Sequence, residues 1–428
     1  MTDAPVAHNV VGDNPAAQIM RSFYQHSLAS QLAVPKILGL SASPVMNSKL
    51  ASLNNIEATL DARCRTPTLN RSELLSFVNM PELRPVQYVA MGIPPTPAAP
   101  SVMGSLLTVI QHLDIEDDPW VIHLRQQDDD DSKLALRKCL IKQKSSSRDQ
   151  LTSFRKKAET VYMELGHWAA DFYITESIRR FVDKLNDSPT YLDDLARQER
   201  AYVCKILQLV NTALFDAVPE IQNDEIRDKV VQLIQSIPKD DSLLGIVFLK
   251  ERVVTAVLRI LLAKHSSTRH LRIGSVMGNS VDTTRKKKNE LINIIQIDDQ
   301  QDTLADFRSG QLDLVISTSV MEEGIDVPAC NFVLCFDMPA NLKSFIQRRG
   351  RARQQQSTLV IMSPSASIVS TWQTLEAQMK EMYADTERQI KALAELDANE
   401  EMDNRSLRIQ STGWVTISQT NEHLTNEV

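Results

Sequence analysis

The sequence contains little glycine. Twelve of its 428 residues are glycine, about 2.8%, whereas an average protein has about 7%. This scarcity argues against glycine-rich turns and all-β architectures, and it favours a helix-rich chain. No glycine is followed by lysine, so the phosphate-binding loop G-x-x-x-x-G-K-[ST] is absent from these 428 residues. A nucleotide site in this chain is therefore either incomplete or of another kind.

Cysteine and histidine motifs are absent as well. The five cysteines are widely spaced and form no C-x-x-C pair, which favours a reducing compartment. The eight histidines form neither H-E-x-x-H nor a zinc-finger spacing, so we predict no metal site from ligand patterns. There is no basic N-terminal segment before an apolar run, and no apolar run approaches 18 residues. We expect a soluble, cytoplasmic protein with no membrane partner, and the nucleus is the alternative compartment.

Charge is present in separate blocks of opposite sign. Residues 113–131 contain eight acidic side chains and one basic one, whereas residues 133–157 contain nine basic side chains and one acidic one. The net charge of −7 therefore averages very different surfaces. Apolar residues recur every three or four positions over 134–214, which predicts packed helices. The basic block has two interpretations, a solvated helix face or a helix that faces RNA.

From residue 243 the pattern changes to short β-rich runs that alternate with helical segments. This alternation predicts an α/β fold with an open, doubly wound parallel sheet. The expected strands are 245–250, 272–278, 312–319 and 331–338, and the expected helices are 252–264, 300–308 and 342–353. Earlier in the chain we expect strands at 36–43 and 85–91 and a helix at 48–60, and towards the end polar helices over 367–396.

The strongest chemical signal is STSVMEEGIDVP (317–328), followed by SFIQRRGRARQ (344–354). Hydroxyl side chains at the end of a buried strand can bond phosphate oxygens. Four arginines stand within six residues of the second segment: Arg348, Arg349, Arg351 and Arg353. Like charges at that spacing repel one another, so a polyanion is expected to neutralise them. A triphosphate, with an arginine finger, and nucleic-acid phosphates both fit.

These two segments resemble motifs V and VI of superfamily 2 helicases, and their residues are similar to those motifs in the Dicer and RIG-I-like branch. GIVFLKER (245–252) resembles motif IV of that branch, and LSASP (40–44) resembles motif III. MELGHWAADFYI (163–174) is similar to fungal Dicer-like proteins of the antiviral type-2 group. RIQSTGWVTISQTNEHL (408–424) resembles the opening of the Dicer dimerisation domain.

The resemblance implies a RecA-like fold with an all-α helical insertion and C-terminal bridging helices. The implied division is 1–92 for the end of a first RecA-like domain, 100–230 for the insertion, 231–365 for the second RecA-like domain, 366–407 for the bridging helices and 408–428 for the start of the dimerisation domain.

The resemblance also implies ATP and Mg²⁺ as cofactors and assigns roles to nine residues. Gln347, Arg351 and Arg353 would face the triphosphate with Arg351 as the arginine finger, Gly324 and Asp326 would bind the nucleotide, Thr318 and Ser319 would contact the RNA backbone, and Ser41 and Ser43 would couple the nucleotide and RNA sites.

The chain departs from the family pattern in three places. Motif I is missing, and the Asp and Glu positions of motif II hold Pro5 and Val6, followed by His8. The two ribonuclease III domains of the family are also absent. We therefore expect a chain that is incomplete at both ends, and that by itself neither hydrolyses ATP nor cleaves RNA. A truncated gene product is an alternative explanation.

The implied function is ATP-dependent engagement of double-stranded RNA in RNA silencing and antiviral defence. The implied partners are double-stranded RNA, a double-stranded-RNA-binding protein and components of the Argonaute pathway. Two alternatives stay open: a non-catalytic RNA-binding or interaction fragment, and a RIG-I-like duplex RNA helicase.

Overall fold

The computed structural model describes the greater part of the chain up to residue 384. The described residues are 7, 10–41, 50–62, 64, 73, 77–90, 100–186, 194–215, 221, 223–240, 242–278, 300–322, 325–365 and 368–384. The chain forms two compact units. One unit comprises Met1–Asn79, Pro339–Gly350 and Ser367–Val428, and the other comprises Met80–Met338 and Arg351–Ala366.

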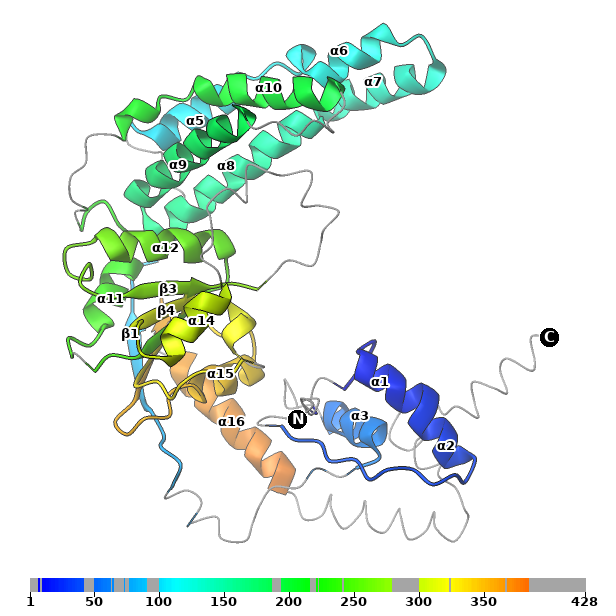
Figure 1. The fold of residues 1–428 in the computed structure, drawn as a ribbon, viewed down its shortest axis with the longest axis vertical. Coiled ribbons are helices and arrows are strands. Elements are labelled where there is room, and N and C mark those ends of the chain that lie inside the picture. Colours follow the sequence, from blue (N-terminus) through cyan, green and yellow to red (C-terminus); the bar gives the residue numbers. More distant parts are fainter. Residues whose placement is uncertain are drawn as a thin grey trace. The chain divides into compact units, whose positions relative to one another are not determined.

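The second unit is built on a six-stranded sheet with the order β1-β6-β5-β2-β4-β3 (Figure 1). All five strand pairs are parallel. The strands are β1 (Glu82–Gln87), β2 (Gly245–Phe248), β3 (Ile273–Val276), β4 (Leu314–Ser317), β5 (Phe332–Cys335) and β6 (Thr358–Ser363). The α/β fold class with a doubly wound, RecA-like parallel sheet is thereby confirmed.

The central strands are short and apolar because both of their faces are covered. Every residue of β2, β4 and β5 is buried, as expected for a parallel sheet between helices. Helix α12 (Arg252–Lys264) packs against β3 and β4, α14 (Gln300–Arg308) packs against β3, and α11 (Asp228–Ser236) packs against β6. The strands expected after residue 243 are all present, and α12 has the expected bounds.

The strand expected at 85–91 is β1 (Glu82–Gln87), and it pairs with β6 in the sheet of the second unit. The implied division placed this segment in a first domain that ends at residue 92, whereas the compact units divide between Asn79 and Met80. Pro85 is compatible with β1 because β1 is an edge strand, where a missing N–H donor is tolerated.

The helical insertion expected at 100–230 lies in the same unit (Figure 1). Its helices are α5 (Val102–Gln111), α6 (Pro119–Gln126), α7 (Asp130–Lys142), α8 (Ser146–Leu165), α9 (His167–Asn186) and α10 (Asp194–Gln208), with 3₁₀ turns at Ile115–Asp117 and Thr212–Leu214. The all-α character predicted for this block is therefore confirmed in its described part.

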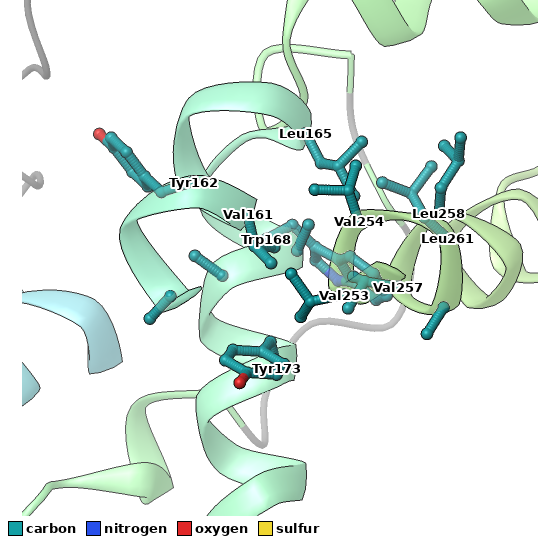
Figure 2. Packing of buried hydrophobic residues seen from close by; sticks show 14 of the residues in the cluster. Val161, Tyr162, Leu165, Trp168, Tyr173, Val253, Val254, Val257, Leu258 and Leu261 are labelled. Atoms are coloured by element: carbon teal, nitrogen blue, oxygen red, sulfur yellow. The ribbon is translucent and has the colours of Figure 1, made fainter. Parts of the chain in front are cut away.

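The insertion and the sheet share one hydrophobic core. Figure 2 shows side chains of α8 and α9, among them Leu165 and Trp168, next to Val254 and Val257 of α12. All four residues are buried and belong to the same cluster as the strand side chains. The insertion is therefore packed onto the sheet domain as part of a continuous interior.

One of the few glycines permits the turn between α8 and α9. Gly166 has φ +111°, and a Cβ atom at this position would lie 2.6 Å from the carbonyl oxygen of Glu225. The peptide next to Gly166 is thus close to the segment that precedes α11, where the N–H of Arg227 donates to the carbonyl oxygen of Leu165 at 3.0 Å. Only glycine fits this approach without strain.

The first unit begins with α1 (Pro15–Ile19), a π-helical turn (Met20–Gln25), α2 (His26–Ala29) and α3 (Leu50–Leu60). The prediction of a strand at 36–43 is wrong for its described part, residues 36–41, which form no strand. A strand needs a paired neighbour, and within residues 36–41 the structure has only a bridge position at Leu40, whose carbonyl oxygen accepts the N–H of Ala7 at 2.9 Å. The side chains of Leu38 and Leu40 are exposed.

The remaining helices of the first unit are α15 (Leu342–Arg349) and α16 (Ile368–Ala384). The prediction that the basic helix continues to Arg353 is wrong, because α15 ends before Gly350. Helix α16 covers the first half of the expected 367–396 segment, and the expected dimerisation-domain start at 408–428 lies outside the described residues. None of the described helices combines the length and the apolarity that crossing a bilayer requires.

Candidate functional site

The fold collects polar groups at the carboxyl ends of its strands. Strand β2 lies between β5 and β4, so Lys250, Thr318 and Asp337, which follow β2, β4 and β5, lie on one edge of the sheet. This edge is where open parallel sheets bind their ligands.

The loop after β4 holds the predicted RNA contacts. Ser317 is fully buried, and its hydroxyl donates to the carbonyl oxygen of Thr318 at 2.9 Å. The Thr318 hydroxyl accepts the N–H of Gly278 at 3.4 Å, which ties this loop to the end of β3. Ser319 begins a short 3₁₀ helix (Ser319–Met321) and is exposed. Ser319 is thus open to solvent, whereas most of Thr318 is covered.

The predicted nucleotide-binding pair falls later in the same loop. Gly324 lies outside the described residues. Asp326 is exposed, and its carbonyl oxygen accepts a hydrogen bond from Arg308 Nε at 3.0 Å. The Asp326 carboxylate therefore stands at the surface of the domain, where a ligand has access to it.

The Arg351 side chain forms hydrogen bonds to two backbone carbonyl groups of the loop after β4. Its Nη1 donates to the carbonyl oxygen of Ile325 at 3.0 Å, and its Nη2 donates to the carbonyl oxygen of Glu322 at 2.9 Å. The residue is 7% exposed. A planar guanidinium can satisfy two carbonyls from one side chain, so Arg351 orders the loop on which Asp326 and Ser319 stand. Its guanidinium is thus directed at its own loop.

A short parallel bridge holds Arg351 and Arg353 beside this loop. Cys330 and Ala352 form the bridge, with the N–H of Cys330 donating to the carbonyl oxygen of Arg351 and the N–H of Arg353 donating to that of Cys330. Arg353 is exposed. Burial raises the pKa of the Cys330 thiol to about 12, although the two arginines act to lower it, so this thiol stays protonated and packs as an apolar group.

Helix α15 carries the remaining motif residues in the first unit. Gln347 is half-buried and Arg348 is buried. Arg349 Nη2 donates to Glu376 Oε1 of α16 at 2.8 Å, and the guanidinium lies over the Phe345 ring at 5.5 Å. Phe345 in turn stacks on Trp372 with ring centroids 5.9 Å apart. Arg349 therefore holds α16 rather than a solvent-accessible anion.

Of the two predicted coupling residues, only Ser41 is described. It is exposed and follows Leu40, whose carbonyl oxygen accepts the N–H of Ala7. Ser43 lies outside the described residues.

A buried ionic network at the sheet edge was missed by the sequence analysis. Lys229 Nζ lies 2.7 Å from Glu164 Oε2 of α8 and 2.8 Å from Asp337 Oδ1 after β5. The other Asp337 oxygen accepts the N–H of Lys250 at 2.8 Å. The ammonium also lies 4.1 Å from the centre of the Phe336 ring. This one lysine therefore connects the insertion, α11 and the strand edge.

The electrostatics of this network keep Lys229 charged. Burial acts to lower the pKa of Lys229, but the carboxylates of Asp337 and Glu164 outweigh it, so the pKa lies above its ordinary value. No local sequence pattern predicts this network, because Lys229 is 65 positions from Glu164 and 108 positions from Asp337.

The described residues contain no group of three or more His, Cys, Asp and Glu side chains that could hold a metal ion. For the remaining residues, the absence of a metal site stays a prediction from the sequence.

Comparison with known proteins identifies relatives over nearly the whole chain. Residues 228–355 match the family described as helicase conserved C-terminal domain. Dicer-like protein 2 of Aspergillus fumigatus is 38% identical over 419 residues, which is 96% of this chain and 30% of that protein. Dicer-like protein 2 of Pyricularia oryzae is 37% identical over 424 residues, 98% of this chain and 28% of that protein. This chain thus spans less than a third of the length of these relatives.

A solved structure, the Hef helicase domain of Pyrococcus furiosus, aligns with a TM-score of 0.36 and 16% identity, covering 86% of this chain and 72% of that one. The sequence comparisons confirm the predicted resemblance: the chain is related to the helicase region of Dicer-like proteins.

Proposed function

We propose that this relative of the Dicer-like helicase region binds double-stranded RNA and takes part in RNA silencing and antiviral defence. The observation that carries the proposal is 38% identity to a Dicer-like protein over 96% of the chain. The helicase C-terminal family match over residues 228–355 supports the same assignment. ATP binding, a double-stranded-RNA-binding protein and components of the Argonaute pathway are further parts of this proposal.

The proposed RNA contacts are the hydroxyls at the end of β4. Ser319 is exposed at the strand edge, and Thr318 precedes it. Hydroxyl and backbone N–H groups in such a loop bind phosphate oxygens without reading the base sequence. Arg351, bonded to the carbonyl oxygens of Glu322 and Ile325, then acts as a positioning residue that fixes the shape of this loop.

ATP would supply the energy for the proposed ATP-dependent engagement of double-stranded RNA. The residues present fit the nucleotide only in part. Arg353 and Asp326 are exposed groups that could contact a nucleotide, and Gln347 is half-buried on α15. However, the 428 residues contain no Gly-Lys phosphate loop, and the motif II positions that would hold the Asp and Glu for Mg²⁺ are Pro5 and Val6. We therefore propose that this chain alone does not turn over ATP.

The test of RNA binding is a titration of a fluorescent blunt-ended duplex RNA with the full chain at several salt concentrations. We expect saturable binding whose logarithmic affinity falls linearly with the logarithm of the salt concentration. Ser319→Ala should weaken binding by about tenfold, as loss of a hydrogen bond to a charged group predicts. Ser309→Ala, which removes an exposed hydroxyl after α14, is the matched control and should bind as the parent does.

Two results would contradict the proposal. If the chain shows no salt-dependent binding of the duplex, the proposal that it binds RNA is wrong. If phosphate is released from ATP and the release increases when RNA is added, the proposal that the chain alone does not turn over ATP is wrong.

A second candidate function is a non-catalytic RNA-binding or interaction module. The missing Gly-Lys pair favours it, because such a module needs no phosphate loop. Duplex binding that is unchanged by ATP would support this module, whereas binding that ATP weakens or strengthens would support a nucleotide-responsive helicase region, of Dicer or of RIG-I-like type.

A further inference from the structure

Helix α7 lies at the tip of the insertion, beside α6 (Figure 1). The α6–α7 pair has a small hydrophobic cluster of its own, separate from the main core. It contains three buried residues, Ile115, Val121 and Cys139, with Trp120, Leu136 and Leu140 packed around them. A helix of 13 residues is marginal in isolation and depends on such packing. The packing of α7 against α6 therefore depends on a small number of apolar side chains.

The outward face of α7 exposes two large aliphatic side chains. Leu134 is 50% exposed and Ile141 is 81% exposed. Seven positions separate them, which places both on the same face of the helix, opposite Cys139 of the small cluster. A pair of exposed aliphatic side chains at this spacing is the pattern by which one helix packs on another.

Cations surround these two aliphatic side chains. Arg137, Lys138 and Lys142 are exposed and make no ion pair within the described part of the chain. Most other cations of the basic block are paired: Lys133 with Asp128, Lys144 with Asp149, Arg155 with Glu159 and Lys157 with Glu251. Three of the five cations of the block that have no ion pair among the described residues therefore lie on α7. The other two are on α8: Lys156, and Arg148, which donates to the neutral Gln143 side chain at 3.1 Å.

We infer that the outward face of α7, formed by Leu134, Arg137, Lys138, Ile141 and Lys142, binds an acidic amphipathic helix of a partner protein. Such a helix would cover the aliphatic pair with its apolar stripe and place carboxylates beside the cations, so that apolar burial and charge complementarity act together. This inference is independent of the proposed RNA-binding loop after β4.

RNA fits this face less well. Phosphate groups cannot cover the exposed apolar surfaces of Leu134 and Ile141, whose burial needs an apolar partner surface. A second copy of the chain also fits poorly, because an antiparallel pair of α7 helices would bring Arg137 and Lys138 against their own copies.

The test uses the full chain and a fluorescent synthetic helix with leucine at every third or fourth position and glutamate between. A scrambled peptide of the same composition is the probe control. We expect saturable binding of the amphipathic peptide, and binding at least about tenfold weaker for Ile141→Glu and for the Arg137→Glu/Lys138→Glu double variant.

Two matched variants separate the site from general effects. Leu209→Glu changes an exposed aliphatic residue elsewhere in the insertion, and Lys156→Glu changes an exposed cation on α8. Both should bind the peptide as the parent does. The inference is overturned if the scrambled peptide binds equally well or if Ile141→Glu binds like the parent. It is also overturned if the double variant loses duplex RNA binding while the peptide fails to bind, because α7 would then be an RNA contact.

Discussion

Arg349 of α15 and Glu376 of α16 form a bidentate ion pair that is largely removed from solvent. Their side chains are 15% and 9% exposed, and Nη1 and Nη2 of Arg349 each donate to one oxygen of the Glu376 carboxylate. The sequence places Arg349 in a cluster of four arginines that suggests anion binding. The structure assigns this member of the cluster to the packing of two helices.

Removing one partner of this pair should destabilise the first unit. Glu376→Gln leaves a buried guanidinium without its counter-charge, and we expect a loss of about 3 kcal/mol in the free energy of unfolding, measured by urea denaturation. The double variant Arg349→Met/Glu376→Leu should recover most of that loss, since two apolar side chains need no charge compensation. Arg179→Gln, in an exposed pair with Glu176, should cost under about 1 kcal/mol. Equal losses for Glu376→Gln and Arg179→Gln would contradict the buried pair.

Loss of the charge on Lys229 should loosen the connection between the insertion and the sheet. Lys229→Met leaves Glu164 and Asp337 facing each other without a cation, and we expect it to cost about 3 kcal/mol. Because the folded-state pKa of Lys229 is raised, its contribution is fully present at neutral pH and is lost only as the pH rises through that pKa. Parent and variant should therefore converge in stability only in strongly alkaline solution. If the difference in the free energy of unfolding between the parent and Lys229→Met stays constant even in strongly alkaline solution, the charge on Lys229 is not what stabilises this network.

His265 should make stability depend on pH in mildly acidic solution. Burial lowers its pKa from the ordinary value of 6.5, so the unfolded chain binds a proton more readily than the folded one. The free energy of unfolding should thus fall as the pH drops below about 6.5 and level off below the folded-state pKa. Its Nδ1 accepts the N–H of Ser267 at 3.2 Å, an interaction that protonation removes.

The variant that isolates this effect is His265→Asn, whose amide oxygen can still accept the Ser267 N–H. Thermal unfolding between neutral and mildly acidic pH should show a weaker pH dependence for His265→Asn than for the parent. His112→Asn, at an exposed position, is the control and should follow the parent. The same pH dependence in all three proteins would refute the assignment to His265.

Gly166 should be among the least replaceable glycines. Gly166→Ala combines φ +111° with a Cβ placed 2.6 Å from the carbonyl oxygen of Glu225 and 2.7 Å from the Cα of Ile226, so the segment before α11 would have to move away from the turn between α8 and α9. We expect a cost above about 2 kcal/mol. Gly310 also has positive φ, +74°, but nothing lies within 4 Å of its Cβ position, so Gly310→Ala should cost only the conformational penalty of about 1 to 2 kcal/mol. Urea unfolding of the two variants compares them directly, and equal costs would show that the close approach is unimportant.

Local sequence pattern predicted four of the five strands after residue 243, whereas β6 (Thr358–Ser363) was not predicted. The strands Gly245–Phe248 and Phe332–Cys335 are continuous apolar runs, Leu314–Ser317 is apolar up to its last residue, and α12 is an amphipathic helix between two of them. Strands of this kind can be predicted from the sequence because burial on both faces of a parallel strand favours apolar residues. The resemblance to helicase motifs V and VI also rests on contiguous residues.

Tertiary structure decided what the individual polar residues do. Arg349 and Arg351 are two positions apart in one basic segment, yet one binds a carboxylate of α16 and the other binds carbonyls of the loop after β4. The partners of Lys229 come from α8 and from the end of β5, and the partner of β1 is β6, more than 250 residues later. Contacts between distant segments depend on how the chain folds back on itself, and no local spacing encodes them. The sequence alone therefore determined the class of the fold and where its helicase-like motifs lie, whereas packing determined which charges remain exposed to solvent.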